Sequence, residues 1–222
     1  MNSEIEKVKR ELVKIGKRIA QENLIVGPGG NISAKVGNRV YIKASGISFE
    51  DATEDDYIGV DFNSGEVIEG DKKPSSEIWM HLECYKVRED VKAVVHTHPI
   101  YSIAYAFQDE PLKLFTPDMV ALLGGEIPVV EYVVPGGKEF AGVVGGVIKN
   151  HNGVLVKNHG LVTVGSNLKE ALYRTLLIEN SIKTIFVAKL FGKMGFFTKE
   201  QIEEIDSLEV EKYRRKLLKE KG

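Results

Sequence analysis

The stretch Val91–Pro99, VKAVVHTHP, decides how the rest of this 222-residue chain is interpreted. Its valine-rich run predicts a β-strand that ends in two histidines, His96 and His98, two residues apart. Alternate side chains of a strand project to the same side, so both imidazoles are expected on one face at the strand's exit into a loop. Imidazole binds zinc and similar divalent ions, which makes this pair half of a metal site. Because surface and core histidines show the same short pattern, other parts of the chain must decide between these readings.

The composition is that of an ordinary globular protein, with 43% hydrophobic and 28% charged residues. The length favours one domain over residues 1–222, large enough to bury a core without disulfides. A formal charge of −2 gives no overall field that would attract nucleic acid or acidic membranes, so neither is expected as a partner.

Cysteine usage and hydropathy predict a cytoplasmic location. The single cysteine, Cys84, fits a reducing cytosol, and its place in a predicted helix favours a buried, unreactive thiol. The sequence shows no apolar signal core and no run long enough to span a membrane.

Apolar periodicity and turn residues predict short strands set between helices. Strands are expected at 32–36, 39–44, 57–62, 66–69, 91–98, 154–157 and 161–164, several of them joined as hairpins. Helices are expected from about residue 5, after Pro74, after Pro99, after Gly137 and after Asn167, with a charged helical segment at about 198–222. The helix after Asn167 should bury one stripe of side chains: Leu168, Leu172, Leu176, Ile182 and Phe186. Residues 111–128, which hold three prolines, are expected to be irregular. This order predicts an α/β fold with a mostly antiparallel or mixed sheet covered by helices.

Two further residues are candidates for chemistry. His159 lies in a tight turn between two predicted buried strands and is the natural third ligand beside His96 and His98. The alternative is a surface turn histidine with no ligand role. Glu77 is the candidate acid/base at the start of a helix, although a capping glutamate is common at such a position. No role is assigned to the other two histidines, His81 and His151.

Three short motifs together indicate an anion pocket. They are the glycine-rich loop Gly27–Asn31, the pair Ser45-Gly46 and the pair Ser75-Ser76 before a helix. Backbone N–H groups, serine hydroxyls and a helix N-terminus are suitable donors to phosphate. The chain lacks both the P-loop and the dinucleotide fingerprint, which favours a small phosphorylated metabolite over a nucleotide.

The order and spacing of these motifs resemble the class II aldolase/adducin family over about residues 5–195. The matching segments are Gly29-Gly30-Asn31-Ile32-Ser33, Ser45-Gly46, Pro74-Ser75-Ser76-Glu77, His96-Thr97-His98-Pro99 and Asn158-His159-Gly160. The resemblance implies a three-layer α/β/α domain around a largely antiparallel sheet, assembled as a C4 homotetramer with its sites at subunit interfaces.

The same resemblance implies a role for each motif residue. His96, His98 and His159 would bind one Zn²⁺ per subunit, and Glu77 would be the acid/base and approach the zinc when substrate is absent. The substrate phosphate would be held by six residues: Gly30, Asn31, Ser45, Gly46, Ser75 and Ser76. Two positions depart from the aldolase pattern, which has a tyrosine near Asp118 and an aromatic ring near Pro135. A C-terminal tyrosine that covers the aldolase site is matched here by Tyr213.

Cleaving a carbon–carbon bond beside a carbonyl leaves an enediolate, which a lysine Schiff base or a Lewis-acidic metal can stabilise. The histidines favour the metal route, and the resemblance implies cleavage of a ketose 1-phosphate to dihydroxyacetone phosphate and an aldehyde. Alternatives in the family are a pentulose-phosphate 4-epimerase and a methylthioribulose-phosphate dehydratase. Epimerases carry Asp at the position of Glu77, whereas Asp118 is similar to an acidic residue that they use. A non-catalytic adducin-like module is a further alternative, which the presence of all three histidines and Glu77 disfavours.

Overall fold

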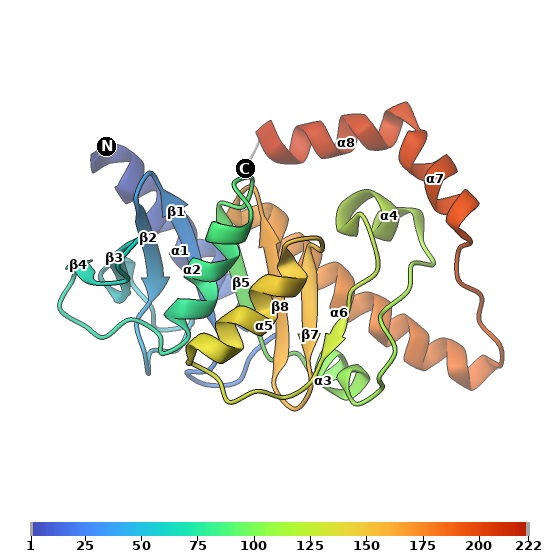
Figure 1. The fold of residues 1–222 in the computed structure, drawn as a ribbon, viewed down its shortest axis with the longest axis horizontal. Coiled ribbons are helices and arrows are strands. Elements are labelled where there is room, and N and C mark those ends of the chain that lie inside the picture. Colours follow the sequence, from blue (N-terminus) through green and yellow to red (C-terminus); the bar gives the residue numbers. More distant parts are fainter. Residues whose placement is uncertain (1, 221–222) are drawn as a thin grey trace.

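An eight-stranded sheet runs through the middle of the molecule in the computed structural model, which describes residues 2–220 (Figure 1). The strand order is β4-β3-β2-β1-β5-β8-β7-β6, and neighbours are antiparallel except for the parallel pair β6 and β7. The strands are β1 (Asn31–Val36), β2 (Arg39–Lys43), β3 (Tyr57–Asp61), β4 (Val67–Glu69), β5 (Ala93–Thr97), β6 (Val129–Val130), β7 (Gly153–Val156) and β8 (Gly160–Gly165). The predicted mostly antiparallel, mixed sheet is confirmed.

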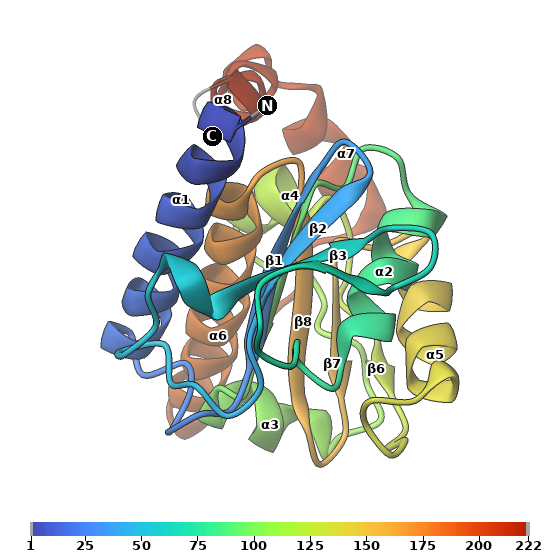
Figure 2. The same ribbon diagram turned by 90° about the vertical axis from the view of Figure 1, so that its left-hand side faces the viewer.

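Helices cover both faces of this sheet and form the expected three layers (Figure 2). On one face lie α2 (Ile78–Val87) and α5 (Lys138–Ile148), and on the other lie α1 (Asn2–Gln21) and α6 (Leu168–Phe191). The remaining helices are a short 3₁₀ turn at Glu54–Asp56, α3 (Ile100–Ala106), α4 (Pro117–Leu123), α7 (Lys199–Ser207) and α8 (Glu209–Glu220).

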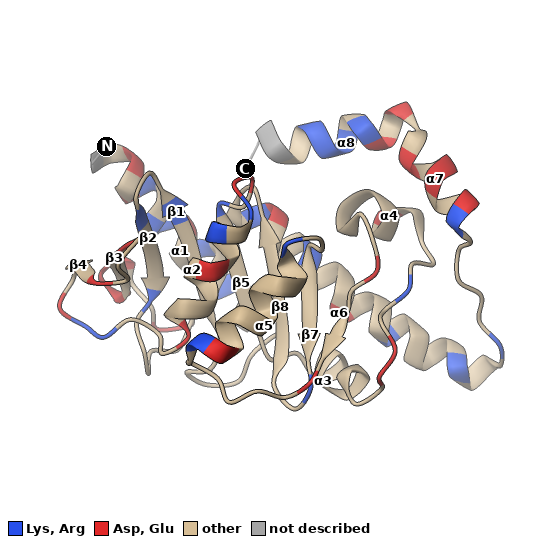
Figure 3. Ribbon diagram, in the orientation of Figure 1, with Lys and Arg blue, Asp and Glu red and all other residues tan. Residues whose placement is uncertain are grey.

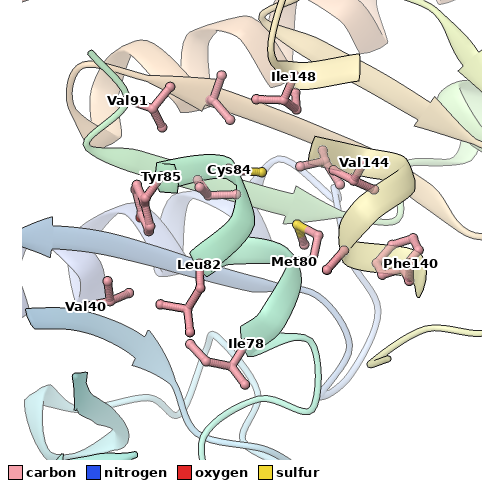
Figure 4. Packing of buried hydrophobic residues seen from close by; sticks show 14 of the residues in the cluster. Val40, Ile78, Met80, Leu82, Cys84, Tyr85, Val91, Phe140, Val144 and Ile148 are labelled. Carbon is pink, nitrogen blue, oxygen red and sulfur yellow. The ribbon is translucent and has the colours of Figure 1, made fainter. Parts of the chain in front are cut away.

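The layer formed by α2 and α5 packs on the sheet through fully buried aliphatic and aromatic side chains, including Leu82, Phe140 and Val144 (Figure 4). Cys84 lies in this layer with none of its surface exposed. Burial raises the pKa of its thiol to about 12, so the thiol stays protonated near neutral pH. The expected burial of this cysteine is confirmed.

Charged side chains gather on the outer helices and loops, while the central strands carry few (Figure 3). Within residues 2–220, no helix is long and apolar enough to cross a membrane.

Two local expectations were wrong. The segment expected to be irregular contains α4, which Thr116 caps by accepting the N–H of Met119 and which ends at Gly124 in the left-handed conformation (φ 70°). Phe186 was expected in the core but is 55% exposed, because α6 is 24 residues long and its C-terminal turns are largely uncovered. Leu168, Leu172 and Ile182 of the same helix are buried as expected.

Candidate metal and substrate site

Three imidazoles converge at one end of the sheet. His96 is the fourth residue of β5, His98 follows that strand, and His159 lies in the turn between β7 and β8. The Nε2 atom of His96 is 3.1 Å from Nε2 of His98 and 3.2 Å from Nε2 of His159. Three nitrogens bound tetrahedrally at about 2.05 Å from a zinc ion would lie about 3.3 Å apart. These two spacings fit one divalent metal ion, and the ligand atoms of all three histidines lie within 4.8 Å of one another.

The orientation of His96 suits a ligand. Its Nδ1 lies 3.1 Å from the carbonyl oxygen of Leu161, which is a hydrogen-bond acceptor, so Nδ1 carries the proton. The lone pair of a neutral ring is then on Nε2, which faces the other two histidines. A backbone carbonyl that fixes the tautomer in this way is typical of metal-binding histidines.

The turn that carries His159 has sequence requirements of its own. Asn158 adopts a left-handed conformation (φ 55°), which asparagine tolerates better than most residues. Gly160 passes so close to β5 that a Cβ atom there would clash with the carbonyl oxygen of Thr97 and the ring of His98. Asn158 and Gly160 therefore let the hairpin place His159 against the other two histidines.

Glu77 is buried, with 7% of its surface exposed, and its carboxylate faces the histidines. Oε2 lies 3.3 Å from Nε2 of His96, and Oε1 lies 3.4 Å from Nε2 of His159. Glu77 stands just before the first residue of α2, and its side chain makes no capping hydrogen bond. The capping-glutamate interpretation is therefore wrong.

Electrostatics in the site are dominated by the Glu77 carboxylate and His96. Burial alone would raise the pKa of Glu77, but the charge and hydrogen bond of His96, with the Asn31 amide, hold that pKa well below its usual range. Burial would lower the pKa of His96, yet the carboxylate outweighs it and raises that pKa. Burial and the His96 charge lower the pKa of His98 to about 3 and of His159 to about 4. These two rings are neutral at pH 7, as a metal ligand must be.

The three motifs of the expected anion pocket lie at the same end of the sheet. A Cβ on Gly30, whose φ is 62°, would come within 2.9 Å of the carbonyl oxygen of His96, so the glycine loop abuts the histidine cluster. The two serine motifs lie side by side, because Ser45 donates its N–H to Lys73 and Ser75 donates its N–H to Lys43. Ser75 also accepts the N–H of Glu77 on its hydroxyl. Asn31, by contrast, has its side-chain amide directed at Glu77.

Sequence reasoning missed Lys43, a cation buried between these loops. Its side chain is fully buried, and Nζ donates to the carbonyl oxygens of Pro28 and Ile47, one in each loop. Burial lowers the pKa of this amine to about 8, against a weaker opposing effect from Asp56. A lysine at the end of a strand normally extends into solvent, so only the fold reveals this one.

Asp118 and Tyr213 lie far from the histidines, whereas Pro135 lies next to a residue that borders the site. Asp118 is in the first turn of α4 and pairs with Arg214 of α8, and Tyr213 is exposed on α8. In both views α4 and α8 lie at the end of the molecule away from the β7–β8 turn (Figures 1 and 2). Pro135 is exposed, but its neighbour Gly136 lies against the Ser76 carbonyl and so borders the site.

Comparison with known proteins defines the class. Residues 10–186 match the family described as Class II Aldolase and Adducin N-terminal domain. The chain therefore belongs to this family and is an enzyme of the class II aldolase type.

The names of individual relatives specify particular substrates. The chain is 38% identical to an L-fuculose phosphate aldolase of Methanococcus vannielii over 83% of its own length and 98% of the relative's. It is 32% identical to a 5-deoxy-D-ribulose 1-phosphate aldolase of Bacillus thuringiensis, over 90% of this chain and 94% of the other. A solved structure named L-fuculose 1-phosphate aldolase superposes with a TM-score of 0.85 at 34% identity, covering 94% of this chain and 96% of that chain.

Proposed function

We propose that this protein is a zinc-dependent class II aldolase that reversibly cleaves a ketose 1-phosphate similar to L-fuculose 1-phosphate. The products would be dihydroxyacetone phosphate and a short aldehyde such as lactaldehyde. The observation that carries this proposal is the Glu77 carboxylate, which lies 3.3 and 3.4 Å from two of three converging imidazoles. The names of the relatives support the substrate class.

The residues present fit a metal ion. Three imidazole nitrogens that lie within 4.8 Å of one another form a zinc-type donor set. The buried Oε1 of Glu77 has no hydrogen-bond partner among the described residues, so a cation beside it would relieve an unsatisfied charge. His96, His98 and His159 would hold the ion, with Glu77 approaching it in the absence of substrate. Bound zinc supplies a Lewis acid for the negative charge that develops on substrate oxygens.

The chain's own residues position the substrate and move a proton. In cleavage, the hydroxyl on the departing carbon loses its proton as the carbon–carbon bond breaks and the aldehyde forms. Glu77 would pass this proton to the carbon that has lost the aldehyde, and in synthesis it would remove the proton from that carbon. Its burial beside the ligands keeps the carboxylate within reach of a substrate held there. The phosphate would be held by backbone and side-chain donors of Gly30, Ser45, Gly46, Ser75 and Ser76. Asn31 would contribute through its backbone only, because its side-chain amide is engaged by Glu77 and His81. Lys43 would add a positive charge beneath both loops.

The assembled form belongs to the same proposal. We infer a homotetramer in the cytoplasm whose sites lie at subunit interfaces. Because Asp118 and Tyr213 lie on helices away from the histidines of their own chain, they would reach the site of a neighbouring subunit. The acidic Asp118 and the exposed Pro135 loop would then set which aldehyde is accepted.

Reaction products distinguish this proposal from its rivals. Metal-stripped protein, alone and with added Zn²⁺, should be incubated with L-fuculose 1-phosphate, 5-deoxyribulose 1-phosphate, a pentulose 5-phosphate and methylthioribulose 1-phosphate. Triose phosphate formed only with metal supports the aldolase, whereas an epimer or a dehydrated diketone would reassign the protein. Absence of turnover together with absence of stoichiometric zinc binding would favour the adducin-like module. Trapping of a substrate adduct by borohydride would instead indicate a Schiff base.

A further inference from the structure

A chain of buried polar side chains runs from Glu77 into the core behind it. Nδ2 of Asn31 lies 2.7 Å from Oε2 of Glu77, and Oδ1 of the same amide lies 2.5 Å from Nε2 of His81. The other ring nitrogen, Nδ1 of His81, is 2.7 Å from the hydroxyl of Ser33, which is 2.7 Å from the hydroxyl of Tyr85. Asn31 is 3% exposed, Tyr85 is 2% exposed, and His81 and Ser33 are fully buried.

Two periodicities bring these residues together. Asn31 and Ser33 are alternate residues of β1 and project to the face covered by α2. Glu77, His81 and Tyr85 are four residues apart and follow one stripe of α2. Successive members of the hydrogen-bond chain therefore come in turn from α2 and from β1.

The direction of each hydrogen bond follows from the end at Glu77. A carboxylate only accepts, so Asn31 donates through Nδ2 and presents Oδ1 to His81. His81 must then donate through Nε2. Burial lowers the pKa of His81 to about 3, so Nδ1 is an acceptor for the Ser33 hydroxyl, which in turn receives the Tyr85 proton. Every bond donates toward the carboxylate, and such a chain is strengthened by mutual polarisation.

This direction settles the orientation of the Asn31 amide. If the donor of His81 were lost, the Glu77 carboxylate alone would favour Oδ1 on the inner side, and that buried oxygen would have no donor. The amide would then be held from one end only, and it could shift or rotate so that its hydrogen bond to Glu77 is weakened or lost. The imidazole thus controls a group that it reaches only through Asn31.

We propose that His81, held as the Nε2–H tautomer by Ser33 and Tyr85, is a positioning residue that acts through Asn31 to fix the Glu77 carboxylate. This rests on the proposed function only in taking Glu77 as the acid/base. His81 touches neither substrate nor metal in this assignment. Its loss should therefore lower kcat, while the KM for the ketose phosphate and the zinc stoichiometry are retained.

Two amide substitutions test the position of the donor. In His81→Gln the side-chain N–H can stand where Nε2 stood, whereas in His81→Asn it can stand only near Nδ1. Both variants bury the same polar group. We expect His81→Asn to lose kcat about 10- to 100-fold, as outer partners of metal sites do, and His81→Gln to recover most of it. Equal losses in both variants, or a rise in KM in place of the fall in kcat, would overturn the proposal.

Cys84→Ala is the matched control for packing. Cys84 lies on the same helix, is also fully buried, and takes no part in the polar chain (Figure 4). It should lower the melting temperature yet leave kcat close to wild type. A comparable fall in kcat in Cys84→Ala would show that core damage, not donor position, explains the His81 variants.

A readout that needs no activity separates this proposal from the proposed function. In ¹⁵N-labelled protein, the ring nitrogens of His81 should show a protonated Nε2 and an unprotonated Nδ1. The opposite tautomer or a charged ring would overturn the proposal even in an active enzyme. Failure of the wild-type protein to cleave any ketose phosphate would refute the proposed function. The tautomer measurement would then still test the proposed hydrogen-bond chain from Tyr85 to Glu77.

Discussion

The Glu77 carboxylate meets three different partners with its two oxygens. Oε2 faces the Asn31 amide and His96, while Oε1 faces His159 and is otherwise unpaired among the described residues. The two oxygens are therefore suited to different roles. Oε2 is held in place, and Oε1 is available to a metal or to a substrate carbon.

Replacement of Glu77 by Gln should separate binding from turnover. The amide keeps the shape of the side chain but cannot take up a proton as a carboxylate does. We expect the variant to fold, to retain zinc through the three histidines, and to lose about 10²- to 10⁴-fold in kcat. Metal analysis and steady-state kinetics measure both effects. Turnover near the wild-type rate would rule out Glu77 as the acid/base.

The lowered pKa of Lys43 leads us to expect that phosphate binding depends on pH. Burial lowers its pKa to about 8, so the amine is charged below that pH and becomes neutral as the pH rises through it. Inhibition by inorganic phosphate should therefore weaken above about pH 8. Because a hydrogen bond to a charged group contributes about 1.5–3 kcal/mol, Lys43→Met should weaken inhibition by about 10- to 100-fold at pH 7. The variant should also lose the pH dependence, and an unchanged profile would show that Lys43 does not face the phosphate.

Among the elements, the β7–β8 hairpin has the strictest steric requirement. A methyl group at Gly160 would overlap the Thr97 carbonyl, and relief of that overlap must push β8 away from β5. We expect Gly160→Ala to cost about 1–3 kcal/mol in the free energy of unfolding and to weaken zinc binding through His159.

Gly146→Ala is the control for that substitution. Gly146 lies in α5, and a Cβ there would meet no atom within 4 Å. Alanine should stabilise this helix by about 0.5–1 kcal/mol. Chemical denaturation of both variants gives the comparison, and equal stability changes would contradict the steric argument.

Local sequence patterns predicted the helices and strands well, but they predicted poorly which side chains the neighbouring elements bury. The hairpins, α5 and α6 follow from periodicity and turn residues, and the His-x-His spacing correctly brought two imidazoles together. Thr116, Pro117 and Gly124 did carry the start and stop signals of α4, which the surrounding prolines obscured. The exposure of Phe186 and the burial of Lys43 depend on where neighbouring elements end, which no local pattern contains. For the same reason His81 was given no role, although its spacing from Glu77 and Tyr85 was visible.

For the whole molecule, the proposed homotetramer predicts active sites shared between subunits. Tyr213 is 61% exposed, so Tyr213→Ala should leave the fold of each chain intact while lowering turnover. In the proposed tetramer, subunits of this variant mixed with Glu77→Gln subunits should regain activity, because some interfaces would combine an intact Glu77 with an intact Tyr213. Subunit exchange followed by assay measures this recovery. Failure to recover, or full activity of Tyr213→Ala, would contradict shared sites.

The register that sets Asn31 opposite His96 has a consequence for how the protein loses activity on heating. These residues lie on β1 and β5, which are interior strands of the sheet with neighbours on both sides. Backbone amides of such strands exchange with solvent only when most of the structure opens, whereas terminal helices exchange through local fraying. We therefore expect Asn31 and His96 to belong to the slowest-exchanging part of the structure. Loss of catalytic activity on heating should coincide with cooperative unfolding of the protein. A folded but inactive state should not be populated at lower temperature.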